Sequence, residues 1–118
     1  MTAARRRAER SGRLAEWAAA FWLMAKGYRL LGRRLRTPFG EVDLAFWKGG
    51  VLVIVEVKRR RRITAGLEAV GPHQQGRLAR AALALAQRWR LSRAPIRFDV
   101  VVVGAGALPH HVRAAWTA

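Results

Sequence analysis

Residues 40–58 read GEVDLAFWKGGVLVIVEVK, and this stretch decides the fold. Polar and apolar residues alternate from Glu41 to Phe46, which is the pattern of a β-strand with one face in the core. The glycine pair Gly49-Gly50 predicts a tight hairpin turn. The nearly continuous apolar run Val51–Val57 predicts a central strand that is covered on both faces. The stretch therefore predicts two adjacent antiparallel strands.

The flanking sequence predicts that this hairpin belongs to one mixed α/β domain. Apolar residues at helical spacing indicate a first helix that is apolar on nearly every side, so we expect it to be buried between other elements. Ser11 is the expected N-cap of this helix. The expected elements, in chain order, are a frayed basic tail at residues 1–10, a helix at Ser11–Lys26, strands at Tyr28–Leu35, 41–46 and Val51–Val57, a loop at Ile63–Pro72, a helix at His73–Trp89 and a strand at Ile96–Val103. We expect the domain to span residues 11–118.

The composition points to a polyanionic partner. The chain has 118 residues, 23 Lys and Arg against 7 Asp and Glu, a formal net charge of +16 and no cysteine. Nucleic acid is the expected partner, because phosphate contacts by Lys and Arg supply most of its non-specific affinity. An anionic membrane surface is a weaker competitor, and the apolar run Trp17–Ala25 is shorter than the about 20 residues that a membrane span requires. The lack of cysteine excludes disulfides and is compatible with a reducing cytoplasm, where we expect the protein.

Three of the seven acidic residues lie on the predicted hairpin, although the chain is strongly basic. Because side chains alternate along a strand, Glu56 and Lys58 share a face, and the hairpin brings Asp43 nearly opposite Glu56. Two adjacent carboxylates repel each other, and a divalent cation removes that repulsion. Mg²⁺ or Mn²⁺ would be held by Asp43, Glu56 and a strand carbonyl such as that of Val57. Lys58 could then orient or deprotonate an attacking water molecule, or hold charge in the transition state.

A solvent-exposed strand face with cross-strand ion pairs is the alternative interpretation of the same residues. Such faces are common, but residues 51–55 are too apolar to be half-exposed. A glutamate and a lysine at the end of a buried strand also require polar partners. Both observations favour a site.

The hairpin residues carry a resemblance to a known family. An aspartate followed by Glu-x-Lys, here Asp43 and Glu56-Val57-Lys58, resembles the core of the PD-(D/E)XK nuclease superfamily. The longer string GEVDL, a glycine hairpin and VIVEVKRR resembles a YraN-type uncharacterised bacterial family, whose fold is similar to archaeal Holliday junction resolvases. The resemblance covers residues 12–116. Its other matching segments are Ala15-Glu16 with Lys26-Gly27-Tyr28-Arg29, Glu68-Ala69-Val70 with Pro72 and Gln75, and Arg97-Phe98-Asp99-Val100.

The resemblance implies a restriction-endonuclease-like fold, a mixed central sheet flanked by helices, with a nuclease-type site. It assigns Asp43 and Glu56 as metal ligands and Lys58 as the catalytic lysine. It implies that Glu16 is an auxiliary acid and that Gln75 lies near the active site. The residues expected to contact phosphates are Arg59, Arg60, Arg61, Arg62 and Arg77.

Three positions depart from the family pattern. Ala15 stands where a glycine is expected, and Val42 stands in place of a proline. Gln74 replaces a usual lysine, which removes one phosphate contact.

His110 and His111 are expected to be structural or surface residues, because adjacent histidines on an extended chain point to opposite sides.

The sequence therefore predicts Mg²⁺-dependent phosphodiester hydrolysis in nucleic acid, DNA rather than RNA, with branched DNA among the candidate substrates. The alternative is a basic scaffold with a nuclease fold that binds nucleic acid without cutting it. We expect no membrane association. A homodimer is a candidate state, with the helix at residues 73–89 as its candidate interface.

Overall fold

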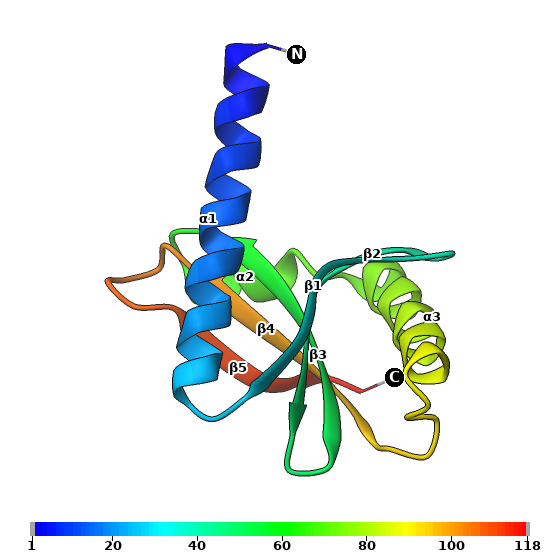
Figure 1. Ribbon diagram of the computed structural model, residues 1–118. Coiled ribbons are helices and arrows are strands. Elements are labelled where there is room, and N and C mark those ends of the chain that lie inside the picture. Colours follow the sequence, from blue (N-terminus) through cyan, green and yellow to red (C-terminus); the bar gives the residue numbers. More distant parts are fainter. Residues whose placement is uncertain (1, 118) are drawn as a thin grey trace.

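A computed structural model of the chain describes residues 2–117 as one five-stranded sheet with helices on both faces (Figure 1). The strands are ordered β1-β2-β3-β4-β5, and all neighbours are antiparallel except β3 and β4, which are parallel. This confirms the mixed α/β class and is compatible with a restriction-endonuclease-like fold. The elements are α1 (Ala3–Ala25), β1 (Arg29–Thr37), β2 (Gly40–Lys48), β3 (Val51–Arg59), α2 (Ile63–Glu68), α3 (Pro72–Arg88), β4 (Ile96–Val103) and β5 (His110–Trp116).

The quoted stretch forms the predicted hairpin. Gly49 and Gly50 both have positive φ, 56° and 80°, as the tight turn between two twisted strands requires. The strand that follows lies in the middle of the sheet, and Leu52 to Val55 are fully buried. The continuous apolar run thus reflects a strand that is covered on both faces.

Two apolar clusters hold the layers together, one on each face of the sheet. Ala19, Ala20 and Leu23 of α1 pack against the side chains of Val53 and Val55 on one face. On the other face, α3 packs against the side chains of Leu52 and Ile54; its core residues are Leu78, Ala81, Ala82, Leu85 and Ala86. Alternate residues of β3 therefore face different helices, which decides where its polar residues lie.

The first helix differs from the prediction in its start and in its burial. It begins at Ala3, because the side-chain oxygen of Thr2 accepts a hydrogen bond from the N–H of Arg5 at 3.1 Å, and the Ala and Arg residues that follow are strong helix formers. Ser11 is therefore not the N-cap. The helix is also not buried on all sides, since Leu14 and Phe21 are 68% and 61% exposed. The division of the chain at residue 11 into tail and domain stays a prediction.

Two further elements were not predicted. Residues 63–68, expected to be a loop, form α2, which lies so close to β4 that a Cβ on Gly66 would collide with the side chain of Val102. The segment after residue 104 contributes β5, an edge strand that pairs with β4. None of the helices among residues 2–117 is long and apolar enough to cross a membrane.

Candidate active site

The hairpin register brings Asp43 and Glu56 together. Leu44 pairs with Val55, so the next pair along the two strands is Asp43 with Glu56, and their carboxyl groups interact. The N–H of Val57 donates a hydrogen bond to Asp43 Oδ2 at 2.8 Å. Glu56 is only 4% exposed. The pair lies on the face that α3 covers, because Glu56 continues the side of the strand formed by Leu52 and Ile54.

The electrostatics of this pair are unfavourable without a cation. Burial, and then the hydrogen bond and charge of Glu56, raise the pKa of Asp43 from its ordinary 3.8 to about 8. The N–H of Val57 and the positive charge of Lys58 act in the opposite direction but are outweighed. At neutral pH the carboxyl pair therefore favours keeping a proton, which a bound divalent cation would displace.

Helix α3 supplies a contact to Glu56 that the sequence did not predict. Gln74 Nε2 donates a hydrogen bond to Glu56 Oε2 at 2.8 Å. Gln75, the predicted neighbour of the site, instead donates its side-chain N–H to the carbonyl of Val70 at 2.9 Å. Helical spacing could not separate the two glutamines, because both precede Leu78 by one turn and lie toward the sheet. The loop at residues 69–71 decides between them, because the carbonyl of Val70 in this loop accepts the hydrogen bond of the Gln75 amide.

Arg77 fixes this helix to the β1–β2 turn. Its Nη1 donates to the carbonyls of Phe39 and Glu41 at 3.0 and 3.1 Å, and its Nε lies 3.4 Å from Gln74 Oε1. The guanidinium predicted to contact phosphate therefore also holds Gln74 against Glu56. Its role in nucleic-acid binding stays a prediction.

Glu16 binds Arg34, an arginine on the strand next to Asp43. Its Oε1 accepts a hydrogen bond from Arg34 Nε at 2.8 Å and lies 3.5 Å from Arg33 Nη1. Strand pairing places Arg34 opposite Asp43, and the pKa of Arg34 is raised by Glu16 first and further by the charges of Glu41 and Asp43. Arg34 is thus a neighbour of the site that sequence reasoning missed, since nothing in the sequence separates it from Arg33 or Arg36.

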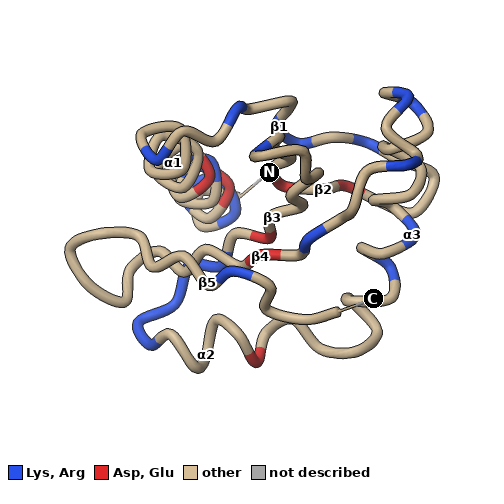
Figure 2. Tube along the Cα trace, turned by 90° about the horizontal axis from the view of Figure 1, so that it is seen from below, with Lys and Arg blue, Asp and Glu red and all other residues tan. Residues whose placement is uncertain are grey.

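A basic run begins at the last residue of β3 and continues beyond the strand. The segment comprises Arg59, Arg60, Arg61 and Arg62, all of which are exposed. Arg59 Nη1 contacts Ser11 Oγ on α1. Figure 2 shows acidic positions on β2, β3 and β4, and further ones on α1 and α2. Phosphate binding by these arginines stays a prediction.

Asp99 belongs to a second polar cluster on the opposite face. It pairs in register with Val55, whose side chain packs in the cluster with α1, and it is fully buried. It accepts hydrogen bonds from both Arg97 Nε and Nη2, from the N–H of Ala114 and from His111 Nε2, at 2.7–2.9 Å. Burial alone would raise the pKa of Asp99, but its bonds to His111, Arg97 and the Ala114 N–H outweigh burial and hold that pKa at about 2. This carboxylate is structurally satisfied and needs no cation.

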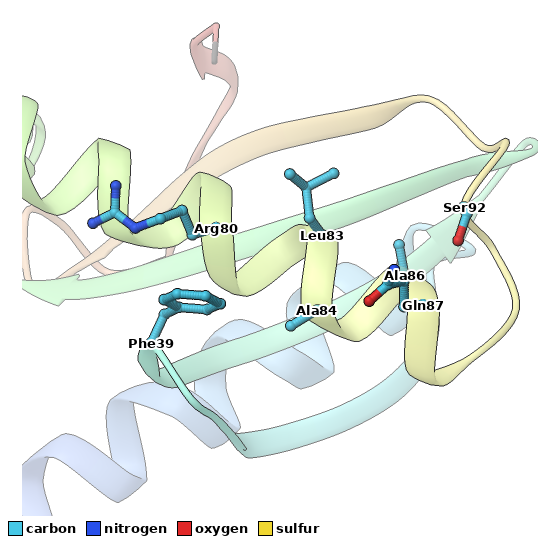
Figure 3. Close-up of a pocket in the computed structure, with 7 residues that line it drawn as sticks. All are labelled: Phe39, Arg80, Leu83, Ala84, Ala86, Gln87 and Ser92. Atoms are coloured by element: carbon cyan, nitrogen blue, oxygen red, sulfur yellow. The ribbon is translucent and has the colours of Figure 1, made fainter.

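A separate hollow of about 360 Å³ lies on the outer side of α3. Figure 3 shows Arg80 beside the ring of Phe39, with Leu83 pointing away from that ring. The guanidinium carbon of Arg80 is 5.9 Å from the centroid of the ring. None of the predicted catalytic residues lines this hollow, so it is distinct from the carboxylate pair.

Two carboxylates, rather than a larger cluster, are what the site offers a metal. Within residues 2–117, no group of three or more His, Cys, Asp or Glu side chains is arranged to hold an ion. The oxygen-only pair nevertheless suits Mg²⁺, which uses one or two carboxylates and completes its shell with water and substrate phosphate. The raised pKa of Asp43 agrees with this fit, because a cation would offset the repulsion between the two carboxylates.

Comparison with known proteins places the chain in a family. Its residues 15–103 match the uncharacterised protein family UPF0102. The chain belongs to the UPF0102 family. It is 50% identical to a UPF0102 protein of Maricaulis maris over 117 residues, which cover 98% of this chain and 92% of that relative. A UPF0102 protein of Caulobacter vibrioides is 50% identical over 110 residues, with 92% and 88% covered. One from Mesorhizobium japonicum is 43% identical over 116 residues, with 98% and 93% covered. The expected YraN-type membership is confirmed, and the candidate-site residues Glu16, Asp43, Glu56, Lys58 and Gln74 lie within the matched range.

Proposed function

We propose that this UPF0102 protein is a metal-dependent phosphodiesterase that cuts nucleic acid, DNA in preference to RNA. The observation that carries the proposal is the contact between half-buried Asp43 and buried Glu56, where burial and the interaction of the two carboxyl groups raise the pKa of Asp43 although the positive charge of Lys58 acts to lower it. The resemblance of these residues to the PD-(D/E)XK nuclease superfamily supports the same assignment. The proposal includes a cytoplasmic location, in keeping with a chain that has no cysteine.

The residues of the pair would hold Mg²⁺ or Mn²⁺ in this scheme. Asp43 and Glu56 are the side-chain ligands, and the carbonyl of Val57 is the proposed backbone ligand. When bound, the metal supplies Lewis acidity toward the phosphate and lowers the pKa of a bound water molecule. Gln74 fixes the rotamer of Glu56 through its 2.8 Å hydrogen bond, and Asp43 is fixed by the N–H of Val57.

Lys58 is the proposed catalytic lysine. It follows Glu56 by two residues on the same strand face, and its charge acts on Asp43. From this side it can orient an attacking water molecule and stabilise negative charge on the phosphate in the transition state. The arginines at residues 59–62, next along the chain, are the proposed contacts to the flanking phosphates.

A nucleic-acid-binding scaffold without catalysis is the second candidate function. It is favoured by one observation: the carboxylate of Glu16, the expected auxiliary acid, is bound by Arg33 and Arg34. The basic surface would then bind phosphates, and the carboxylate pair would hold a structural ion.

The test is cleavage of labelled single-stranded, duplex, flap and four-way junction DNA, and of RNA, with Mg²⁺ or Mn²⁺. The variant is Lys58→Ala, and Lys26→Ala is the matched control, because Lys26 is an exposed lysine at the end of α1. Cleavage by the wild type and Lys26→Ala, with its loss in Lys58→Ala, would support the phosphodiesterase and identify its substrate. Binding by all three proteins without cleavage would refute it in favour of the scaffold.

A further inference from the structure

The first part of α1, residues 3–10, extends beyond the sheet (Figure 1). All eight residues are exposed, whereas the buried residues of α1 are Ala15, Ala19, Ala20 and Leu23, in its second half. We call residues 3–10 the N-terminal arm. The arm is thus a helical segment without a core contact.

The arm is strongly basic. It contains Arg5, Arg6, Arg7 and Arg10 and a single acid, Glu9, whose Oε2 lies 3.8 Å from Arg13 on the next turn. Within residues 2–117, the four arginine side chains of the arm form no hydrogen bond or ion pair. Their charges are therefore available to a partner.

The arm is unfavourable as an isolated helix. Short helices are marginal in water, and most helical stability in proteins comes from tertiary packing, which the arm lacks. Its arginines lie at the N-terminal end, where positive charge opposes the helix dipole, and the first turn has no acidic residue. Arg6 and Arg10 also repel each other at a spacing of one turn. A polyanion bound along the arm would relieve both effects.

The arm joins the basic run that leaves the candidate site. Arg59 Nη1 contacts Ser11 Oγ, directly after the arm, and Arg59 is one residue beyond Lys58. Two basic segments that are far apart in the sequence, residues 3–10 and 59–62, therefore meet at Ser11. Together they form a basic surface that extends away from the carboxylate pair.

The composition of the arm favours a phosphate backbone over a lipid surface. A helix that lies in a membrane interface needs a large apolar face. The apolar residues of the arm are Ala3, Ala4 and Ala8, while the exposed large side chains Leu14, Trp17 and Phe21 lie further along α1. A second copy of the chain is disfavoured as the partner, because it carries the same net charge of +16.

We propose that the N-terminal arm is a second phosphate-binding surface, which contacts the nucleic-acid backbone outside the carboxylate site. This inference rests on the proposed function for its substrate class. Eight helical residues span about 12 Å, which corresponds to about seven phosphate charges along a duplex. The protein therefore binds a longer tract than the carboxylate site alone would cover, and this added contact carries no base specificity.

The test compares two variants of the full chain that lose equal charge. The arm variant is R5Q/R6Q/R7Q/R10Q, since glutamine is a good helix former. The control variant is R29Q/R90Q/R93Q/R113Q, which removes four exposed arginines outside the arm and the proposed site. Affinity for a duplex of about 30 base pairs is measured in EDTA over a range of salt concentrations, and each bound phosphate contributes about 0.9 to the slope of log K against log salt. If each of the four arginines contacts one phosphate, we expect the slope to fall by about 3.6 in the arm variant, and by less than about 1 in the control.

A lysine variant, R5K/R6K/R7K/R10K, keeps the charge and should retain the slope of the wild type, which separates lost contacts from a misfolded helix. Equal slopes in the arm and control variants would overturn the inference, as would an absence of duplex binding by the wild type. Arm-dependent binding to phosphatidylserine vesicles with unchanged duplex slopes would also overturn it, in favour of a membrane surface. Because binding is measured without metal, the inference stands if cleavage fails but the slopes differ as expected. If cleavage occurs but the arm and control variants have equal slopes, this inference fails while the proposed function stands.

Discussion

Replacing Asp43 with asparagine should make the metal-free protein more stable while abolishing its proposed activity. The asparagine side chain would keep the acceptor for the N–H of Val57, now 2.8 Å from Asp43 Oδ2, and its amide could donate to Glu56. The change therefore removes a charge from the pair and leaves the local packing and hydrogen bonds in place.

The size of the effect follows from the pKa of Asp43. The unfolded chain loses this proton near 3.8, whereas the folded protein holds it until about 8. Between these values the unfolded state binds fewer protons, so the stability of the wild type falls as pH rises, by about 1.4 kcal/mol per pH unit. At pH 7 the interval spans about three units, so Asp43→Asn should raise the free energy of unfolding by up to about 4 kcal/mol.

Urea unfolding in EDTA at several pH values from 4 to 8 measures this effect. The two proteins should differ little near pH 4, and the variant should be the more stable by a growing margin as pH rises toward 8. Mg²⁺ should raise the unfolding midpoint of the wild type and not that of Asp43→Asn. A variant no more stable than the wild type at pH 7, or a wild type whose stability does not change over this range, would refute the reasoning.

The other predictions concern residues around this pair and on the opposite face. Asp99→Asn should lower stability by about 2 kcal/mol at pH 7, because the folded-state pKa of Asp99 is about 2; urea unfolding should show this loss fading as pH falls below about 4 toward 2, where the wild type also becomes protonated. Gln74→Ala should lower kcat about tenfold in cleavage assays and leave the affinity for nucleic acid unchanged, because Glu56 loses its hydrogen bond from Gln74. Gln75→Ala should lower the free energy of unfolding by about 1 kcal/mol without a comparable change in kcat, because only its contact with the loop is lost. Gly66→Ala should destabilise the protein by about 1–3 kcal/mol in urea unfolding, because its Cβ would collide with Val102; unchanged stability would show that α2 can move away from the sheet.

The hairpin could be predicted from the sequence because its signals are local. Strand alternation, a glycine pair and an apolar run fix the register of β2 and β3, and that register alone places Asp43 opposite Glu56. The burial of β3 follows from the same run, since its apolar residues occupy both faces. The core of the candidate site was thus predictable before any tertiary contact was known.

The surroundings of the pair were not predictable, because they depend on packing between distant segments. Gln74 and Gln75 are equivalent by helical period, and only the loop before α3 decides which one contacts Glu56. Arg34 becomes a neighbour of Asp43 through the pairing of β1 with β2 and through Glu16 on α1. The length of α1 was missed for another reason: Thr2 supplies a cap, and burial gives no sign of where an exposed helix begins.

The contrast between Asp99 and the Asp43–Glu56 pair is the physical argument for a function at the pair. Asp99 has donors on both oxygens, from Arg97, His111 and the backbone, and its pKa is low. Asp43 lies in the same basic chain, with 23 Lys and Arg available, yet the hydrogen bond that holds it comes from one backbone N–H, and its pKa is high. The guanidinium of Arg34, on the neighbouring strand, is bound by Glu16. A protein that satisfies one buried aspartate so fully and leaves a carboxylate pair short of positive charge bears a stability cost at that pair. Such a cost is typical of a functional site, where the missing charge arrives with a ligand. A divalent cation would supply positive charge to the carboxylate pair, and a phosphate backbone would supply negative charge to the surrounding arginines.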